Sequence, residues 1–173
     1  MKGSGRMNLK IRKMKEQDAI TISFWQYTKP YDWYNLNGCK EYVEEFLEDN
    51  YYTVLNHEEQ VVGFYCYGKS AQVSIGKLND LYEDTTYTDI GLGMNPLLCG
   101  KGYGPSFVKL GMEYAKNKFK SQKFRLTVAD FNVRAVKTYE KVGFKNMGAF
   151  KKQSIRFIVM CYEEKRFPEN DDF

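Results

Sequence analysis

A glycine-rich turn is the stretch of this sequence best suited to holding an anion. Cys99–Gly104 (CGKGYG) follows a strand-like stretch, Thr88–Met94, and precedes a helix predicted to open at Pro105. Glycines let the backbone approach a ligand closely, and the first N–H groups of a helix point toward it with the positive end of the helix dipole behind them. The turn therefore predicts a site for a phosphate-bearing ligand, although such a turn alone is not specific.

Known nucleotide- and RNA-binding patterns differ from this turn. A Walker loop requires GxxxxGK[ST], whereas Gly102 is followed by Tyr103. A Rossmann fingerprint requires GxGxxG, and the spacing here is GxGxG. Lys101–Val108 nearly carries the KGYG-F-V signature of the RNA-recognition motif, but Pro105 is incompatible with a central strand. The turn therefore does not favour binding of RNA, and no nucleic-acid partner is expected.

A second motif, Phe131–Phe144 (FNVRAVKTYEKVGF), carries groups that could bind a ligand or donate a proton. Asn132 is a good helix N-cap residue, and Gly143 stands where a left-handed residue ends a helix. Tyr139 follows Asn132 by two helical turns, so both side chains can face the same ligand. The Tyr139 hydroxyl is a candidate proton donor, and a plain core position beside Ala135 is the alternative.

Other reactive side chains give weaker indications. Asp89, near the start of the strand that leads to the turn, is a candidate general base, and a solvated or capping carboxylate is the alternative. Cys99 has no accompanying base and is better interpreted as a small packed thiol than as a nucleophile. His57 is the single histidine. His-based triads and multi-histidine metal sites are therefore excluded, and no metal is expected.

Length and composition are those of one globular domain. The 173 residues can bury a substantial core, and the net charge of +4 is too small to indicate nucleic acid. No apolar run approaches the roughly 20 residues of a membrane span. The four cysteines show no CxxC spacing, which favours reduced thiols in the cytoplasm. We expect residues 1–7 to be a cloning remnant or a disordered start, and residues 8–167 to form a single domain.

Hydrophobic periodicity predicts the order of the elements. Strands are expected at Asn8–Lys13, Tyr51–Asn56, Gln60–Tyr67, Thr88–Met94, Lys123–Ala129, Phe144–Phe150 and Ile155–Glu163. Helices are expected at Glu16–Trp25, at Cys39–Asp49, from Pro105, and from Asn132 to Gly143, while Ser70–Glu83 is expected to be a loop with a short strand end and residues 168–173 a frayed tail. This order is typical of one mixed α/β sheet with helices on both faces.

Together, the turn and the second motif resemble the acetyl-CoA-binding core of the GNAT N-acetyltransferase family. In that family the turn reads (Arg/Gln)-x-x-Gly-x-(Gly/Ala), and Cys99–Gly104 keeps both diagnostic glycines. The helix pattern N-x-x-A-x-x-x-Y-x-x-x-G-F is matched without a gap from Asn132 to Phe144. The resemblance covers residues 87–145. It implies a GNAT-like acyl-CoA N-acyltransferase fold, with a central, mostly antiparallel sheet and helices on both faces.

The resemblance also implies which residues contact acetyl-CoA, the cosubstrate. The turn would hold the pyrophosphate, the strand end would hydrogen-bond the pantetheine arm, and the second motif would lie near the thiol. The implied cofactor-binding residues are Leu92, Gly93, Met94, Cys99, Gly100, Lys101, Gly102, Tyr103, Gly104, Pro105, Asn132 and Tyr139. The implied catalytic residues are Tyr139, as proton donor to the leaving thiolate, and Asp89 as general base, with a water chain as the alternative base.

Two departures from the family pattern bear on function. Cys99 replaces the usual Arg or Gln, so one donor near the phosphates is lost and the effect on cofactor affinity stays open. Thr127 stands where ribosomal-protein N-terminal acetyltransferases tend to carry Glu, which counts against that narrow activity. We expect direct acetyl transfer to a primary amine of a small molecule or protein. A non-catalytic acyl-CoA-binding or sensing module is the alternative, and a homodimer is an option that the sequence leaves open.

The identity of the amine acceptor is not indicated by any motif. The stretch Trp25–Asn35 (WQYTKPYDWYN) is rich in aromatic residues, and Pro30 disfavours a continuous helix there. Its aromatic side chains are expected either to form a lid packed on the core or to wall the acceptor pocket, and both can hold at once.

Overall fold

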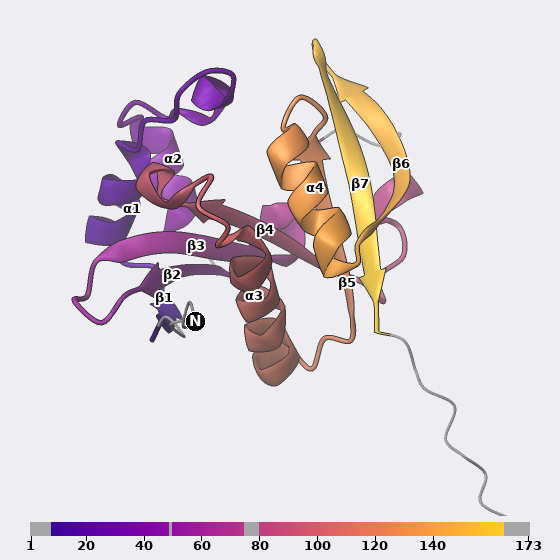
Figure 1. Ribbon diagram of the computed structural model, residues 1–173, viewed down its shortest axis with the longest axis horizontal. Coiled ribbons are helices and arrows are strands. Elements are labelled where there is room, and N and C mark those ends of the chain that lie inside the picture. Colours follow the sequence, from indigo (N-terminus) through magenta and orange to yellow (C-terminus); the bar gives the residue numbers. More distant parts are fainter. Residues whose placement is uncertain (1–7, 49, 75–79, 165–173) are drawn as a thin grey trace, which may run out of the picture.

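A seven-stranded mixed sheet organises the chain in the computed structural model, which describes residues 8–48, 50–74 and 80–164 (Figure 1). The strand order is β1-β2-β3-β4-β5-β7-β6. The strands are β1 (Lys10–Lys13), β2 (Tyr51–Leu55), β3 (Val61–Tyr67), β4 (Thr88–Met94), β5 (Lys123–Ala129), β6 (Lys145–Lys152) and β7 (Ile155–Glu163). The expectations for residues 1–7 and 168–173 fall outside the described residues.

The helices stand where the apolar periodicity predicted them. They are α1 (Glu16–Ser23), α2 (Lys40–Phe46), α3 (Gly104–Phe119) and α4 (Val133–Val142), with short 3₁₀ turns at η1 (Tyr31–Tyr34), η2 (Gly68–Ala71), η4 (Asp80–Tyr82) and η5 (Pro96–Leu98). The order of strands and helices along the chain is the predicted one. Within the described ranges, none of the helices combines the length and the apolar character needed to cross a bilayer.

Two predicted segments differ from the structure. The helix expected at Cys39–Asp49 ends at Phe46, because the N–H groups of Leu47 and Glu48 turn back to carbonyls three residues earlier. In the described part of Ser70–Glu83 there is no strand end. The η2 and η4 turns lie there instead, and each is closed by a local hydrogen bond of the same three-residue kind.

The sheet opens between β4 and β5. These two strands run parallel and pair only at Thr88 with Phe124 and at Asp89 with Arg125, whereas the other neighbouring pairs are antiparallel. Beyond Asp89, β4 continues to Met94 paired with β3 on its other edge. Figure 1 shows the two strands diverging near the centre of the molecule. Backbone groups on the free edge of β4 are therefore available to a ligand.

The two faces of the sheet carry separate apolar clusters. On β3, Tyr65 and Tyr67 belong to the cluster formed with α3, while Cys66 belongs to the cluster formed with α1 and α2, against which Phe64 also packs. Successive side chains of a strand point to opposite faces. The helices therefore cover both faces, as predicted. The hydroxyls of Tyr65 and Tyr67 also donate to backbone carbonyls of α3, at 2.7 Å each.

A partly buried ion pair fixes α1 to the sheet. The Arg12 guanidinium donates to both carboxylate oxygens of Asp18, at 2.5 and 3.0 Å, and the Thr53 hydroxyl donates to the same carboxylate at 3.0 Å. Burial alone would raise the pKa of Asp18, but the hydrogen bonds from Arg12, the Lys15 backbone and Thr53 outweigh it and lower that pKa. This cluster holds the first helix against β1 and β2.

Candidate active site

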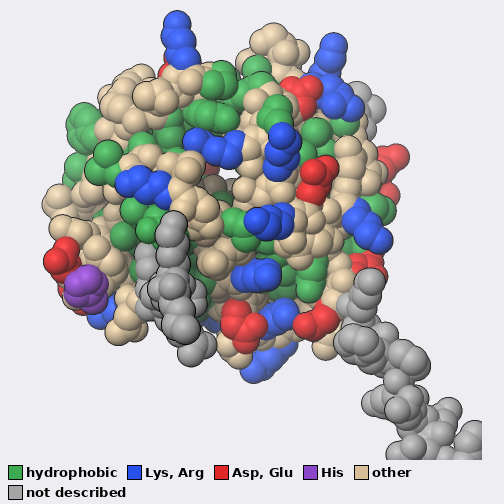
Figure 2. All heavy atoms as spheres, viewed as in Figure 1, with side chains coloured by type: hydrophobic (Ala, Val, Ile, Leu, Met, Phe, Trp, Pro, Cys, Tyr) green, Lys and Arg blue, Asp and Glu red, His purple; other side chains and the backbone are tan. Residues whose placement is uncertain are grey.

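A cavity of about 720 Å³ lies where the sheet opens. It is lined by the glycine turn and the start of α4 on one side, by β4 in the middle, and by the aromatic stretch with α2 on the other. Figure 2 shows a hollow near the centre of one face of the molecule, with Lys and Arg side chains around it. A cavity of this size fits a drug-sized ligand, so the opening of the sheet is the candidate active site.

The glycine turn lines one side of the cavity. Gly100 and Gly102 have φ angles of +73° and +83°, which side-chain-bearing residues rarely adopt. No atom lies within 4 Å of where a Cβ on Gly102 would stand. Gly104 and Pro105 also line the cavity, whereas Lys101 and Tyr103 are not among the lining residues. The turn thus presents bare backbone and open space to the cavity, which is what a bound pyrophosphate needs.

The middle of the cavity is formed by the end of β4. Leu92, Gly93 and Met94 all line it. A Cβ on Gly93 would overlap the ring of Phe64, so the glycine lets this ring lie directly against the β4 backbone. The Met94 carbonyl already accepts a hydrogen bond from the Tyr27 hydroxyl at 2.8 Å. This carbonyl is therefore already occupied. The other backbone groups on the free edge of β4 are the ones left for the predicted pantetheine contacts.

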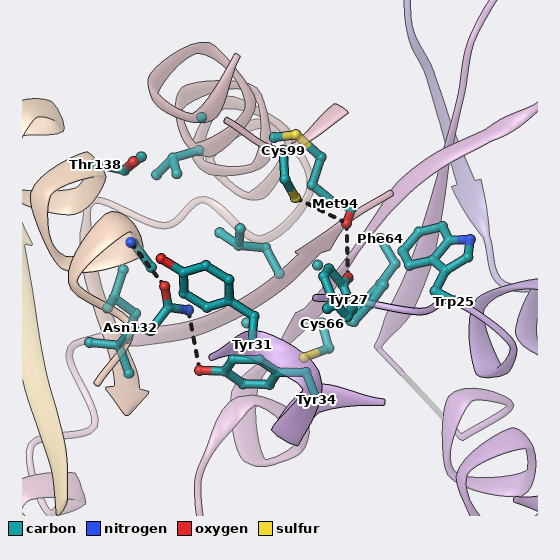
Figure 3. Close-up of a pocket in the computed structure, with 18 of the residues that line it drawn as sticks. Trp25, Tyr27, Tyr31, Tyr34, Phe64, Cys66, Met94, Cys99, Asn132 and Thr138 are labelled. Atoms are coloured by element: carbon teal, nitrogen blue, oxygen red, sulfur yellow. Dashed lines mark hydrogen bonds between the residues drawn. The ribbon is translucent and has the colours of Figure 1, made fainter. Parts of the chain in front are cut away.

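Asn132 caps helix α4 and joins it to the aromatic stretch. Its side-chain oxygen accepts from the Ala135 N–H at 3.1 Å, which confirms the predicted N-cap. Its side-chain nitrogen donates to the Tyr34 hydroxyl at 3.2 Å, the contact drawn in Figure 3. Tyr139 lines the same cavity and is half-buried. Burial, with Tyr34 nearby, raises the pKa of Tyr139, so its hydroxyl keeps its proton at neutral pH.

Asp89 lies in a buried ion pair and does not line the cavity. Arg125 donates to its two carboxylate oxygens at 2.6 and 2.8 Å, and Gln72 donates to one of them at 2.8 Å. A carboxylate engaged in this way is not placed to take a proton from an amine bound in the cavity. We therefore assign Asp89 a structural role, in place of the general-base role that its position in the sequence suggested.

Arg134 places a positive charge beside the turn, where Cys99 offers none. The half-buried Cys99 thiol lies 3.7 Å from the Met94 carbonyl oxygen, and burial raises its pKa, while the positive charge of Arg134 acts in the opposite direction. The Arg134 guanidinium lies 4.1 Å above the ring of Tyr31, and one of its nitrogens is 3.9 Å from where a Cβ on Gly100 would stand. A cation therefore lies beside the turn, from a different element.

Sequence reasoning missed Arg134. It is the one basic residue among the described residues that line the cavity. The signal was present in the sequence, since Arg134 stands in the first turn of the helix that Asn132 opens. Only the packing of α4 against the glycine turn makes that position significant. A Cβ on Gly104 would meet the Thr138 side chain at 2.9 Å, so this glycine permits the close approach.

The aromatic stretch packs on the sheet and also lines the cavity. Trp33 packs on Phe131 and Phe157, with ring centroids 5.8 and 6.2 Å apart, which attaches the stretch to the second half of the sheet. Other aromatic residues of the stretch point their rings into the cavity, as the close-up in Figure 3 shows for Tyr27, Tyr31 and Tyr34. The cavity therefore has a polar, cationic side at the turn and an aromatic side opposite to it.

Comparisons with known proteins agree with this geometry. A family model described as the acetyltransferase (GNAT) family matches residues 14–144. No curated protein matches the chain. Similar solved structures include the aminoglycoside acetyltransferase AAC(6')-Ib in complex with coenzyme A, at 20% identity and a TM-score of 0.67, covering 90% of this chain and 95% of that one.

Two further solved structures show the same likeness. A spermidine N-acetyltransferase chimera of Vibrio cholerae SpeG and hSSAT has 18% identity and a TM-score of 0.63, covering 90% of this chain and 95% of that one. An acetyltransferase (GNAT family) from Bacillus anthracis has 18% identity and a TM-score of 0.60, covering 90% and 94%. At such identities, the structural likeness shows a shared fold.

Proposed function

Because the chain belongs to the GNAT acetyltransferase family, we propose that it transfers an acetyl group from acetyl-CoA directly to a primary amine. One observation carries this proposal. The glycine turn, the free edge of β4 and Tyr139 open into the same cavity, in the opening of the sheet between β4 and β5. A phosphate-binding turn, an extended backbone edge and a proton donor are the groups that this reaction requires.

The described residues fit acetyl-CoA. Gly100 and Gly102 would place backbone N–H groups around the pyrophosphate, and the N-terminus of α3 would add its positive dipole. Arg134 would supply the side-chain charge that Cys99 cannot. The free edge of β4 would hold the pantetheine arm by backbone hydrogen bonds, and it would direct the thioester toward the aromatic side. Acetyl-CoA would supply the acyl group as an activated thioester.

The protein's own groups would assist the proton movements. A primary amine with a pKa near 10.4 is neutral in only about 1 of 2,500 molecules at pH 7. The aromatic side of the cavity removes water from the amine and thereby disfavours its charged form. A water molecule would take the remaining proton, since Asp89 is engaged elsewhere. Tyr139 would donate a hydrogen bond to the departing thiolate and pass it the proton, and the proton that water took from the amine would return to the tyrosinate.

The experiment is acetyl transfer by purified protein, read as release of free thiol from acetyl-CoA with a panel of primary amines. Tyr139→Phe keeps the ring and removes the hydroxyl, so we expect thiol release to fall by roughly 10–10³-fold while the dissociation constant of CoA changes little. Tyr114→Phe is the matched control, because Tyr114 is a half-buried tyrosine of α3 that does not line the cavity. Wild-type turnover in a folded Tyr139→Phe variant would remove the proton-donor role.

A non-catalytic acyl-CoA-binding module is the second candidate. The ion pair of Asp89 favours it, because the carboxylate that could have served as a base is committed to Arg125. Such a module would bind acetyl-CoA by calorimetry and release no thiol with any amine. Amine-dependent thiol release above the rate of spontaneous hydrolysis would exclude it.

A further inference from the structure

We propose that the acceptor is a small primary amine on an aromatic or alkyl body, with a single positive charge, recognised by ring faces and not by carboxylates. This inference rests on the proposed function and names the substrate class of the same site. It is carried by the side of the cavity that faces α1 and α2.

Aromatic rings dominate that side. Figure 3 shows rings from separate elements directed into the space beside β4. The rings on that side include those of Trp25, Tyr27, Tyr34, Tyr51 and Phe64. Among the described residues that line the cavity, Glu45 is the one acidic side chain. Ring faces attract aromatic groups and an ammonium group, whereas they offer few hydrogen-bond partners to a ligand with many hydroxyls or several ammonium groups.

The tyrosine hydroxyls add little polar character, because several are already engaged. Tyr27 donates to the Met94 carbonyl at 2.8 Å, and Tyr34 accepts from Asn132 at 3.2 Å. Tyr51 donates to Glu45 at 2.9 Å. A sugar or a polyamine would therefore lose hydrogen bonds to water on entry and regain few of them. The apolar body of an alkyl or aromatic amine makes no hydrogen bonds to water, so it has none to lose when it enters the cavity.

Phe64 places this aromatic surface at the reacting position. Its ring lies against Gly93 of β4, in the part of the strand that would present the thioester. The Trp25 ring lies 6.4 Å from it and the Phe46 ring 5.2 Å, measured between centroids. An aromatic or alkyl body packed against the surface formed by Trp25 and Phe64 would bring its amine next to β4.

Glu45 alone supplies too little negative charge to bind a polycation. It is an exposed residue of α2 at the rim, and its carboxylate accepts the Tyr51 hydroxyl. A triamine or an aminoglycoside carries several ammonium groups, and each needs a partner when it leaves water. One rim carboxylate that already accepts a tyrosine hydroxyl cannot pair several ammonium groups. The charges of the cavity therefore fit a monoamine.

The test compares four amines at equal concentration with saturating acetyl-CoA. The amines are 2-phenylethylamine, hexylamine, spermidine and kanamycin, and thiol release gives kcat/KM for each. We expect the value for 2-phenylethylamine to exceed those for spermidine and kanamycin at least tenfold, with hexylamine between them. A value for spermidine or kanamycin equal to or above that for 2-phenylethylamine would overturn the inference and leave acetyl transfer to amines standing.

Substitutions in the cavity test which rings recognise the amine. Trp25→Leu should lower kcat/KM for 2-phenylethylamine at least tenfold and leave the dissociation constant of CoA within about threefold. Phe119→Leu is the control, because Phe119 is a 38% exposed aromatic residue of α3 that does not line the cavity. Phe64→Leu provides a second variant should Trp25→Leu not fold. If folded Trp25→Leu and Phe64→Leu variants both keep the wild-type kcat/KM, recognition by these rings is contradicted.

A binding measurement separates failure of this inference from failure of the proposed function. Calorimetry of the CoA-loaded protein should show 2-phenylethylamine binding at least tenfold more tightly than spermidine, whether or not turnover follows. Binding in that order without any thiol release would support the aromatic site and refute catalysis. No preference between the two amines would refute the aromatic site itself.

Discussion

Removing the guanidinium of Arg125 should destabilise the protein strongly. The Arg125 and Asp89 side chains are 3% and 5% exposed, and they join β4 to β5 at the last pair before the strands diverge. Arg125→Met leaves a buried carboxylate without its cation and also removes a donor from the carbonyls of Tyr82 and Asp84. Breaking a buried ion pair in this way costs about 3–5 kcal/mol. For a chain of 173 residues this lowers Tm by roughly 6–20 °C.

The assay is urea unfolding with thermal melting as a second reading. The double variant Asp89→Leu with Arg125→Met replaces the whole pair by apolar groups, so it should recover at least half of the loss of the single variant. A loss below about 1 kcal/mol in Arg125→Met would refute the reasoning, because it would mean that the pair is hydrated or loosely held.

The same pair decides between the structural and the catalytic reading of Asp89. Asp89→Asn should lose stability, while kcat of the folded fraction stays within about threefold of wild type. A general base would give the opposite pattern, with wild-type stability and a fall in kcat of about 10²-fold or more. That second pattern would restore the role that the sequence suggested and overturn the assignment from geometry.

Three further outcomes follow from the site and from α1. Gly102→Val should weaken acetyl-CoA binding at least tenfold by calorimetry, whereas Gly68→Val, at a similar φ of +68° with equally open surroundings away from the cavity, should not. Saturating CoA should slow alkylation of Cys99, read by mass spectrometry, and leave the rate at Cys39 unchanged; equal protection of both would point to a general stiffening. Because the folded-state pKa of Asp18 is lowered, its contribution to stability is full above the unfolded value of about 3.9 and is lost as pH falls below it. Urea melts at descending pH should show a smaller loss below about pH 4 in Asp18→Asn than in wild type.

The sequence by itself determined the local features of this protein. The order of the strands and helices, the helix cap at Asn132 and the bare glycine turn could be predicted from residue spacing. These features depend on interactions within a few residues, such as the bond from the Ala135 N–H to Asn132, or on the left-handed φ of Gly102. Physical rules for such interactions need no knowledge of the fold.

Only the tertiary structure decided which of these groups share a site. Asp89 meets Arg125, 36 residues away, because β4 and β5 pair in one register at the point where the sheet opens. Tyr34 meets Asn132 across 98 residues, and Arg134 reaches the glycine turn because α4 packs closely on α3. Contacts of this kind are set by strand register and by packing between distant elements. Neither can be read from the spacing of residues along the chain. The partner of each charged group, and therefore the role of Asp89, became clear only from the fold.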